Sequence, residues 1–472
     1  MKKQKIHFVG IKGVGMTPLA LICKQAGHIV SGSDVAEKFI TDKVLAEEKI
    51  IPFVGFLKEH VKGVDLVITT GAHGGFENEE VIEAKKLNIP VWTHGQAVGE
   101  LMRGEILNRK FEGISIAGSH GKTTTTGIVA TVLQNAKLDP TYVIGTSDLT
   151  SLGHSGHFGK GNYFVAEADE YATEPNHDKK PRFLWQYPQV AIFTNIELDH
   201  PDLYSSVGEV RNAFSLFTNN IKPNGFLICN GDDEEIKKLL KDYKGIVVTF
   251  GKSPKNDFVL SRINVTDSQT FFWVQSRGVN LGEFSVGLVG EHNAMNALAV
   301  VALSLEIGIS LQDVKAGLVK YKGSKRRFEY IGKLKSGAMI FDDYAHHPTE
   351  IRKTLQAFRQ AYKKSKIICF FQPHTYSRTK KLFDQFINSF DDADEVIISD
   401  IYPSMREKED ITVSSKLLVS EISRHKSDVF YLPSLKDVVE YIDRKSYDEN
   451  TVIVSMGAGD IYKIRENLTY EN

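Results

Sequence analysis

The residues best suited to chemistry form one short motif, Gly118-Ser119-His120-Gly121-Lys122-Thr123-Thr124. An apolar strand pattern over 114–117 precedes it and a helical pattern over 125–133 follows it, which is the setting of a phosphate-binding loop. Backbone N–H groups of such a loop bind phosphate oxygens, the lysine reaches the terminal phosphates, and the threonine hydroxyl suits Mg²⁺. The spacing is shorter than in the common GxxxxGKS or GxxxxGKT loop. We predict ATP binding through Gly118, His120, Gly121, Lys122, Thr123 and Thr124.

Two more polar residues follow other strand patterns. Glu167 comes after the strand pattern 163–165, and His200 closes the polar segment that follows 190–194. The carboxyl ends of parallel strands share one edge of a sheet, so both side chains are expected beside the phosphate loop. A single acidic residue there is more often a helix cap or a surface charge, but the coincidence favours a site for Mg²⁺, with Mn²⁺ as an alternative. The predicted metal ligands are Thr123, Glu167 and His200.

A second glycine-rich turn, Gly10-Ile11-Lys12-Gly13-Val14-Gly15, lies between the strand pattern 6–9 and a helical pattern. The next strand pattern, 29–32, ends in Ser33-Asp34, which resembles a dinucleotide-binding turn with its ribose-binding acid. Three interpretations are open for this turn: a plain tight turn, an NAD site of an oxidoreductase, or a site for a substrate carried on a nucleotide. Further along the chain, Asn293 and Asn296 share one helix face, and their amides suit an adenine edge.

Elements that would position these residues alternate between helix and strand, which predicts an α/β fold with parallel sheets. Three segments each open with a short apolar strand, and polar stretches separate them near residues 108 and 322. We predict three domains, 1–108, 109–322 and 323–472, because 472 residues are enough for about three cores.

The composition excludes several classes of function. With 58 Lys+Arg and 59 Asp+Glu the formal net charge is -1, so there is no basic field for nucleic acid or an anionic membrane surface. Three widely spaced cysteines favour a reducing cytoplasm. The lysine-rich start lacks an apolar signal core, and Glu306 interrupts the apolar stretch 298–309, so neither export nor a membrane span is expected.

The motifs together, in this order, resemble those of the Mur ligase family of peptidoglycan synthesis. The resemblance covers the phosphate loop, Glu167, His200, the asparagine pair at 293 and 296, the Arg327-Phe328-Glu329 boundary and the segment Asp343-Tyr344-Ala345-His346-His347-Pro348. It implies a Rossmann-like N-terminal domain, a central P-loop ATPase-like domain with a mostly parallel sheet, and a Rossmann-like C-terminal domain. It adds Asn293, Asn296, Arg327 and Asp343 to the ATP site.

Within the family, the segment 371–379 resembles the members that join L-alanine to UDP-N-acetylmuramate, with Thr375 in place of a usual arginine. This similarity implies that the amino acid is bound by Tyr344, His346, His374 and Arg378. It implies that the UDP-sugar is bound by Gly13, Val14, Gly15, Met16, Ser33, Asp34 and His120. The segments 170–173 and 180–183 instead resemble the recycling ligase that uses L-alanyl-γ-D-glutamyl-meso-diaminopimelate.

The implied reaction is an ATP-dependent amide ligation. The lactyl carboxylate of UDP-N-acetylmuramate attacks the γ-phosphate of ATP, and the amine then attacks the resulting acyl phosphate. Lys122, Arg327 and His346 are the expected catalytic residues, with His346 chosen over His347 by its place in the motif, and Arg378 is expected to bind the substrate carboxylate bidentately. An oxidoreductase and a regulatory ATPase are the competing classes, and the first leaves the loop at Lys122 unexplained.

Overall fold

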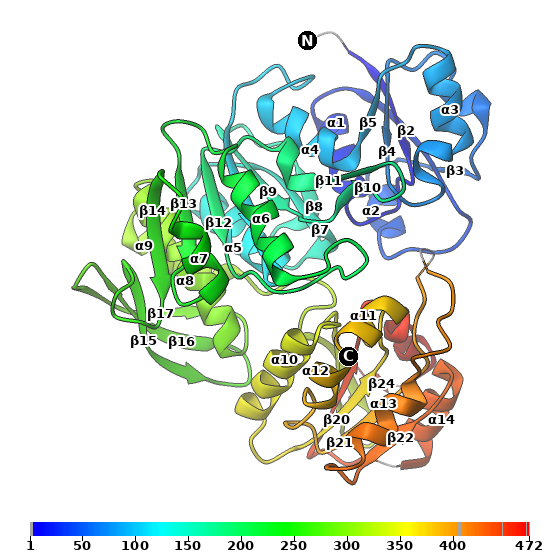
Figure 1. Ribbon diagram of the computed structural model, residues 1–472, viewed down its shortest axis with the longest axis vertical. Helices are drawn as coiled ribbons and strands as arrows, with labels where there is room; N and C mark the ends of the chain where they lie inside the picture. The colour runs from blue at the N-terminus through cyan, green and yellow to red at the C-terminus, as the bar shows by residue number, and fades with distance from the viewer. Residues whose placement is uncertain (1–2, 405–406, 446, 469, 472) are drawn as a thin grey trace.

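The computed structural model describes residues 3–404, 407–445, 447–468 and 470–471. These residues form three large sheets with helices packed against them and one two-stranded sheet, and Figure 1 shows the C-terminal part of the chain below the other two. An α/β fold built on three large sheets confirms the predicted fold class. The boundaries near 108 and 322 are our proposal for where one domain gives way to the next.

The N-terminal sheet is parallel throughout, in the order β3-β2-β1-β4-β5, and its first crossover connects β1 to α1 through the glycine-rich turn. Its elements are β1 (Lys5–Val9), α1 (Met16–Gln25), β2 (Ile29–Asp34), α2 (Asp42–Glu47), β3 (Phe53–Val54), η1 (Lys58–Val61), β4 (Leu66–Thr69), η2 (Gly75–Glu77), α3 (Glu79–Lys86), β5 (Val91–Thr93) and α4 (His94–Arg103). The strand order reverses at β1, and open sheets of this kind bind ligands at that point.

The central sheet is mostly parallel, in the order β17-β16-β15-β14-β13-β12-β6-β9-β7-β8, with antiparallel strands at both edges. The elements of this part of the chain are β6 (Glu112–Ala117), α5 (Lys122–Asn135), β7 (Thr141–Leu149), β8 (Gly153–His157), β9 (Tyr163–Ala168), β10 (Ala172–Glu174), β11 (Asp178–Pro181), η3 (Arg182–Trp185), β12 (Val190–Phe193), α6 (Val207–Thr218), β13 (Phe226–Asn230), α7 (Glu234–Leu240), β14 (Ile246–Gly251), β15 (Phe258–Val265), β16 (Thr270–Ser276), β17 (Val279–Val286), α8 (Glu291–Glu306) and α9 (Leu311–Lys320). Strands β10 and β11 pair with each other in a separate antiparallel sheet of two strands. Strands β9, β6 and β12 are neighbours, so the segments that follow them meet at one edge.

The C-terminal sheet has the order β22-β21-β20-β23-β19-β18-β24, parallel except at β18 and β24. Its elements are β18 (Glu329–Leu334), β19 (Met339–Asp343), α10 (Pro348–Ala361), β20 (Lys366–Phe371), α11 (Tyr376–Lys381), α12 (Phe383–Ile387), β21 (Glu395–Ile398), α13 (Ser415–Ile422), β22 (Val429–Tyr431), α14 (Leu435–Lys445), β23 (Thr451–Met456), η4 (Ile461–Asn467) and β24 (Tyr470–Glu471). In Figure 1, α10 and α11 lie on the side of this sheet that faces the central part.

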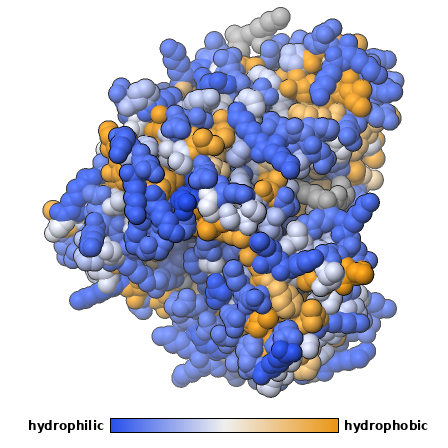
Figure 2. Space-filling view, viewed as in Figure 1, coloured by the Kyte–Doolittle hydropathy of each residue, from blue (hydrophilic) through white to orange (hydrophobic). Residues whose placement is uncertain are grey.

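The hydrophobic cores connect the three parts unequally. The core of the N-terminal sheet continues into the central part through Val143, Phe164 and Ala166. The two cores of the C-terminal sheet contain only residues from 328 onward. The face in Figure 2 is mainly hydrophilic, with hydrophobic residues in small groups. Among the described residues, no helix is long and apolar enough to cross a membrane.

Candidate active site

The phosphate loop lies between β6 and α5, where the sequence pattern predicts it. Gly118 and Gly121 have φ values of 146° and 84°, which side chains rarely adopt, and a Cβ at 118 would lie 1.9 Å from the Thr194 hydroxyl. Helix α5 then begins at Lys122 with its first N–H groups directed into the loop. The two glycines therefore allow a turn that exposes backbone donors to an anion.

A cavity of about 360 Å³ adjoins this loop. The central and C-terminal parts of the chain both contribute to its wall, and Asn296 also packs against Gly121. Seven of the residues predicted to bind ATP line it: His120, Gly121, Thr124, Asn293, Asn296, Arg327 and Asp343. Burial raises the pKa of the Asp343 carboxyl to about 6, partly opposed by Arg327. The cavity is concave, and its lining combines apolar side chains with polar and charged ones, as in nucleotide sites.

Lys122 is engaged by a carboxylate that the sequence motif does not include. Its ammonium lies 2.8 Å from Glu170 Oε2 and donates to the Gly118 carbonyl at 2.6 Å. Burial lowers the pKa of Lys122, but Glu170 and the neighbouring carboxylates outweigh burial and raise it above its usual range. The lysine is therefore charged, and its position beside the loop suits a phosphate that displaces Glu170.

The predicted metal ligands are brought together only in part. The Thr123 hydroxyl donates to Glu167 Oε2 at 3.0 Å, and both oxygens are of the kind that Mg²⁺ prefers. His200 instead groups with Asp169 and Glu170, whose ligand atoms lie within 4.8 Å of one another. Glu170 Oε1 is buried without a hydrogen-bond partner among the described residues, so this edge has an oxygen still to be satisfied.

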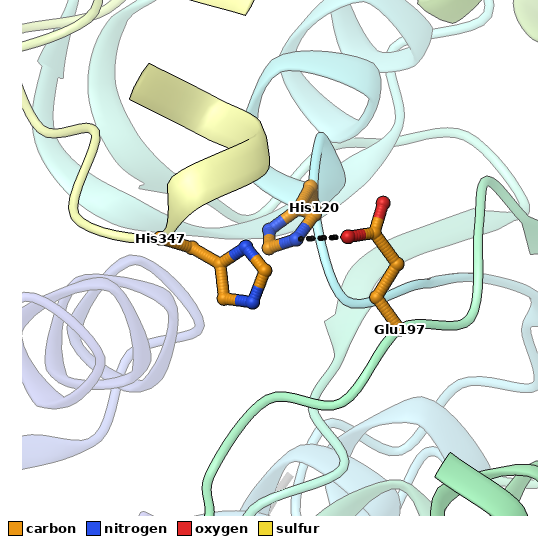
Figure 3. Close-up of side chains that lie close together, drawn as sticks. All are labelled: His120, Glu197 and His347. Carbon is orange, nitrogen blue, oxygen red and sulfur yellow. Dashed lines mark ion pairs between the residues drawn. The ribbon is translucent and has the colours of Figure 1, made fainter. Parts of the chain in front are cut away.

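His120, Glu197 and His347 form a second group whose ligand atoms lie within 4.8 Å of one another (Figure 3). Burial lowers the pKa of His120, but Glu197 and Glu350 outweigh it and raise the pKa to about 9. His347 accepts the Thr349 N–H at Nδ1, so its Nε2 donates to the Leu198 carbonyl at 3.2 Å. His120 forms ion pairs with Glu197 at 3.7 Å and with Glu350 of α10 at 3.4 Å, so the phosphate loop is joined to the segment after β12 and to α10.

The four residues predicted to bind the amino acid lie in one chain of contacts. The rings of Tyr344 and His346 are 5.2 Å apart, those of His346 and His374 are 6.0 Å apart, and His374 Nδ1 lies 3.2 Å from Arg378. Burial lowers the pKa of His346 to about 4, so the imidazole is neutral at pH 7 and is a weak base. His347 is the helix cap of the pair, which supports the choice of His346.

Arg378 is held by a carboxylate of the protein itself. Its guanidinium is buried and donates to Asp199 from Nε at 3.1 Å and from Nη2 at 2.7 Å. The expected bidentate fork for a substrate carboxylate is therefore occupied by a carboxylate of the protein in this structure. The sequence signal for Asp199 was its place beside His200 in the polar segment 195–200.

Comparison with known proteins identifies the family of this chain. Three family models match the chain in order: the Mur ligase family catalytic domain over residues 5–105, the Mur ligase middle domain over 116–304 and the Mur ligase glutamate ligase domain over 326–459. A protein named UDP-N-acetylmuramate–L-alanine ligase from Desulfitobacterium hafniense is 40% identical over 98% of this chain and 99% of its own length. The chain belongs to the Mur ligase family. The resemblance inferred from the motifs is confirmed.

Solved Mur ligase structures are similar over the same length. The UDP-N-acetylmuramate–alanine ligase of Thermotoga maritima has a TM-score of 0.80 and 29% identity, over 98% of both chains. A murein peptide ligase from Psychrobacter arcticus has a TM-score of 0.69 and 25% identity, also over 98% of both chains. The structural similarity is thus greater to the ligase that is named for alanine.

The residues expected to bind the nucleotide sugar surround the first glycine-rich turn of this Mur ligase. Gly13, Val14, Gly15 and Met16 form the turn and the start of α1. The side chains of Ser33 and Asp34 are both buried: Asp34 accepts the Lys12 N–H of the turn at 2.7 Å, and Ser33 donates to Glu80 of α3. His120, which was also predicted for the sugar, lines the cavity beside the phosphate loop instead of this turn. The Lys12 ammonium donates to the carbonyls of Val35 and Glu37, away from a phosphate role.

Sequence reasoning missed Glu350, which joins three predicted groups of the Mur ligase site. Its carboxylate lies 3.4 Å from His120, 3.8 Å from Arg327 and 3.2 Å from His346. The available signal was a capping box, since His347 begins α10 and Glu350 stands three residues later. A capping box predicts a helix start but gives no sign of contacts with the phosphate loop.

Proposed function

We propose that this Mur ligase joins L-alanine to the lactyl carboxylate of UDP-N-acetylmuramate, with ATP as the energy source. One observation carries the proposal: the cavity with seven predicted ATP residues lies beside the cluster of Tyr344, His346 and His374, and both use residues of the C-terminal part. An activated carboxylate formed at the first place is within reach of an amine held at the second. Full-length relatives at 36–40% identity, named for this reaction, support it.

The residues supply the groups that an acyl-phosphate route requires. The lactyl carboxylate attacks the γ-phosphate, ADP leaves, and the amine displaces phosphate from the acyl carbon. Lys122 and Arg327 stabilise the charge that develops on the transferred phosphoryl group, and the neutral His346 orients the amine. We propose that Asn293 and Asn296 bind the adenine edge and that Asp343 and Thr124 complete the nucleotide site.

We propose Mg²⁺ at Thr123 and Glu167, with Mn²⁺ as a substitute. The fit rests on the two oxygen donors 3.0 Å apart and on the burial of Glu167, which raises the pKa of its carboxyl despite the Thr123 hydrogen bond. When bound, the cation would neutralise phosphate charge. His200 with Asp169 and Glu170 offers further ligand atoms on the same edge.

We propose that the UDP-sugar binds at the first glycine-rich turn, through backbone N–H groups of residues 13–16. The side chain of Asp34 then contributes by holding the turn. This arrangement places the sugar substrate on the N-terminal sheet and ATP on the central sheet, and we propose a cytoplasmic reaction, in keeping with the nucleotide substrates.

Mass spectrometry of the products tests the proposal. UDP-N-acetylmuramate, ATP, Mg²⁺ and L-alanine should yield the UDP-N-acetylmuramoyl-alanine amide with one phosphate released per amide. A higher kcat/KM with L-alanyl-γ-D-glutamyl-meso-diaminopimelate than with L-alanine would assign the chain to the recycling reaction. Phosphate release without an amide product would instead make it an ATPase.

A further inference from the structure

The guanidinium of Arg378 has almost no donor left for a ligand. Nε and Nη2 donate to Asp199 Oδ1, and Nη1 donates to the His374 carbonyl at 2.9 Å and lies 3.2 Å from His374 Nδ1. These contacts engage four of the five N–H groups of the arginine. A substrate carboxylate that approaches Arg378 in this structure finds one free N–H group, which is too few for a bidentate contact.

The partner of this arginine comes from a different part of the chain. Asp199 follows β12 of the central sheet, whereas Arg378 belongs to α11 beside the C-terminal sheet. Both side chains are 6% exposed. Removing one member of such a buried pair leaves a charge without compensation, which is strongly destabilising. Arg378 can therefore release Asp199 only to another anion.

We propose that Asp199 is a stand-in for the substrate carboxylate: it holds Arg378 in the substrate-free enzyme, and the α-carboxylate of the amino acid takes its place. This inference rests on the proposed function and assigns to Asp199 a role in selecting the amine. The exchange replaces one carboxylate with another, so the guanidinium stays paired throughout. Released Asp199 retains the His200 backbone N–H, which it accepts at 2.7 Å.

The same arrangement occurs at two other cations of the site. Lys122 is held by Glu170, and Arg327 lies 3.8 Å from Glu350. Each is a cation to which we assign a substrate anion, and each is neutralised by a protein carboxylate. The pair at Arg378 is the one that faces the amine, so it selects for amines that carry a carboxylate.

The test compares L-alanine with L-alaninamide, which has the same amine but no carboxylate. In an Asp199→Asn variant, the competing charge is absent, so the KM for L-alanine should fall about 3–10-fold while the KM for L-alaninamide stays unchanged. Asp202→Asn is the matched control, because Asp202 lies on the same loop and accepts from the Tyr171 hydroxyl at 2.9 Å. The more distant charge of Asp202 also acts on Arg378, so the KM for L-alanine should change much less than in Asp199→Asn.

Two results would overturn the exchange. An equal change of KM for both amines would make Asp199 a structural contact between the parts of the chain. A rise of KM for L-alanine alone would make Asp199 a support that orients Arg378 for the substrate. If the wild-type enzyme ligates L-alanine, either of these results leaves the proposed function intact. If the wild-type enzyme ligates neither amine, both proposals are rejected.

A second measurement uses the wild-type enzyme, in case Asp199→Asn does not fold. The ¹⁵N resonance of Arg378 Nε is assigned by its loss in Arg378→Lys. With ATP analogue and UDP-N-acetylmuramate present, it should shift on addition of L-alanine and stay in place on addition of L-alaninamide. The exchange is contradicted if the resonance does not shift with L-alanine, or if it shifts equally with both amines.

Discussion

At the scale of single residues, the site is a set of cations held by carboxylates. Lys122, His120 and Arg378 each have a carboxylate partner from a distant part of the sequence. Under the proposed function, substrate anions replace the partners of Lys122 and Arg378, so both cations are in position before the ligand arrives. Pairing of this kind also removes the cost of an isolated buried charge.

Lys122→Ala should abolish most ligation while UDP-sugar binding remains close to wild type. The lysine contacts the phosphate loop, whereas the first glycine-rich turn lies on another sheet. Loss of one contact to a transition-state charge reduces kcat by about 10²-fold or more. Product formation and calorimetric titration with UDP-N-acetylmuramate measure the two effects, and wild-type turnover in the variant would refute the assignment of the loop.

The ion pairs of His120 stabilise the folded protein by an amount that depends on pH. The folded pKa of about 9 lies above the ordinary value of 6.5, so this stabilisation is fully present below about pH 6.5 and is lost as the pH rises toward 9. The free energy of unfolding of wild type relative to His120→Gln should therefore decrease between pH 6.5 and 9. Chemical denaturation at several pH values measures this difference, and a constant value would show that the imidazole is not charged in the folded enzyme.

At the scale of elements, close backbone contact joins the first two parts of the chain. Helix α4 packs against η3 through Gly95 and Gly99, and a Cβ at 99 would lie 2.1 Å from the Trp185 carbonyl oxygen. A methyl group cannot fit there without movement of the helix. The position of the UDP-sugar turn relative to the phosphate loop therefore depends on a residue without a side chain.

Gly99→Ala should destabilise the protein by about 1–3 kcal/mol and raise the KM for UDP-N-acetylmuramate, with little change in the KM for ATP. Gly208→Ala is the matched control, since Gly208 also lies in a helix but its Cβ would meet its nearest atom at 3.7 Å. The control should be neutral or slightly stabilising. Thermal unfolding and steady-state kinetics measure both variants, and equal behaviour of the two would exclude the contact as the cause.

At the scale of the whole molecule, the two junctions differ in chemistry. The N-terminal and central parts share an apolar core, whereas the C-terminal part meets the central part through polar contacts such as Thr349 with Glu197 at 2.6 Å. Polar groups of a substrate can replace such contacts, whereas they cannot replace apolar burial. The C-terminal part is therefore the one expected to move when substrates bind.

Calorimetry should resolve at least two unfolding transitions, one for the C-terminal part and one shared by the other two. Leu355→Ala, in the C-terminal core, should lower the temperature of the first transition only. Leu19→Ala, in the shared core, should lower the temperature of the second only. Each substitution should reduce the free energy of unfolding of its own part by about 2–5 kcal/mol. A single transition that both variants lower equally would contradict this division.

The sequence by itself determined the local features of this protein. The strand, glycine turn and helix at residues 114–133 follow from local pattern, because residue types and spacing decide such turns within a few positions. The order of the motifs was enough to indicate the Mur ligase family. Asn293 and Asn296 were also predictable as a pair, since helical spacing puts both on one face.

Only the tertiary structure decided which charges pair. Asp199 and Arg378 are 179 positions apart, and Lys122 and Glu170 are 48 apart. No periodicity connects residues at such separations, because their contact depends on how the sheets are ordered and packed. The fork of Arg378 therefore looked free in the sequence, whereas the fold brings the end of β12 beside α11 and fills that fork with Asp199.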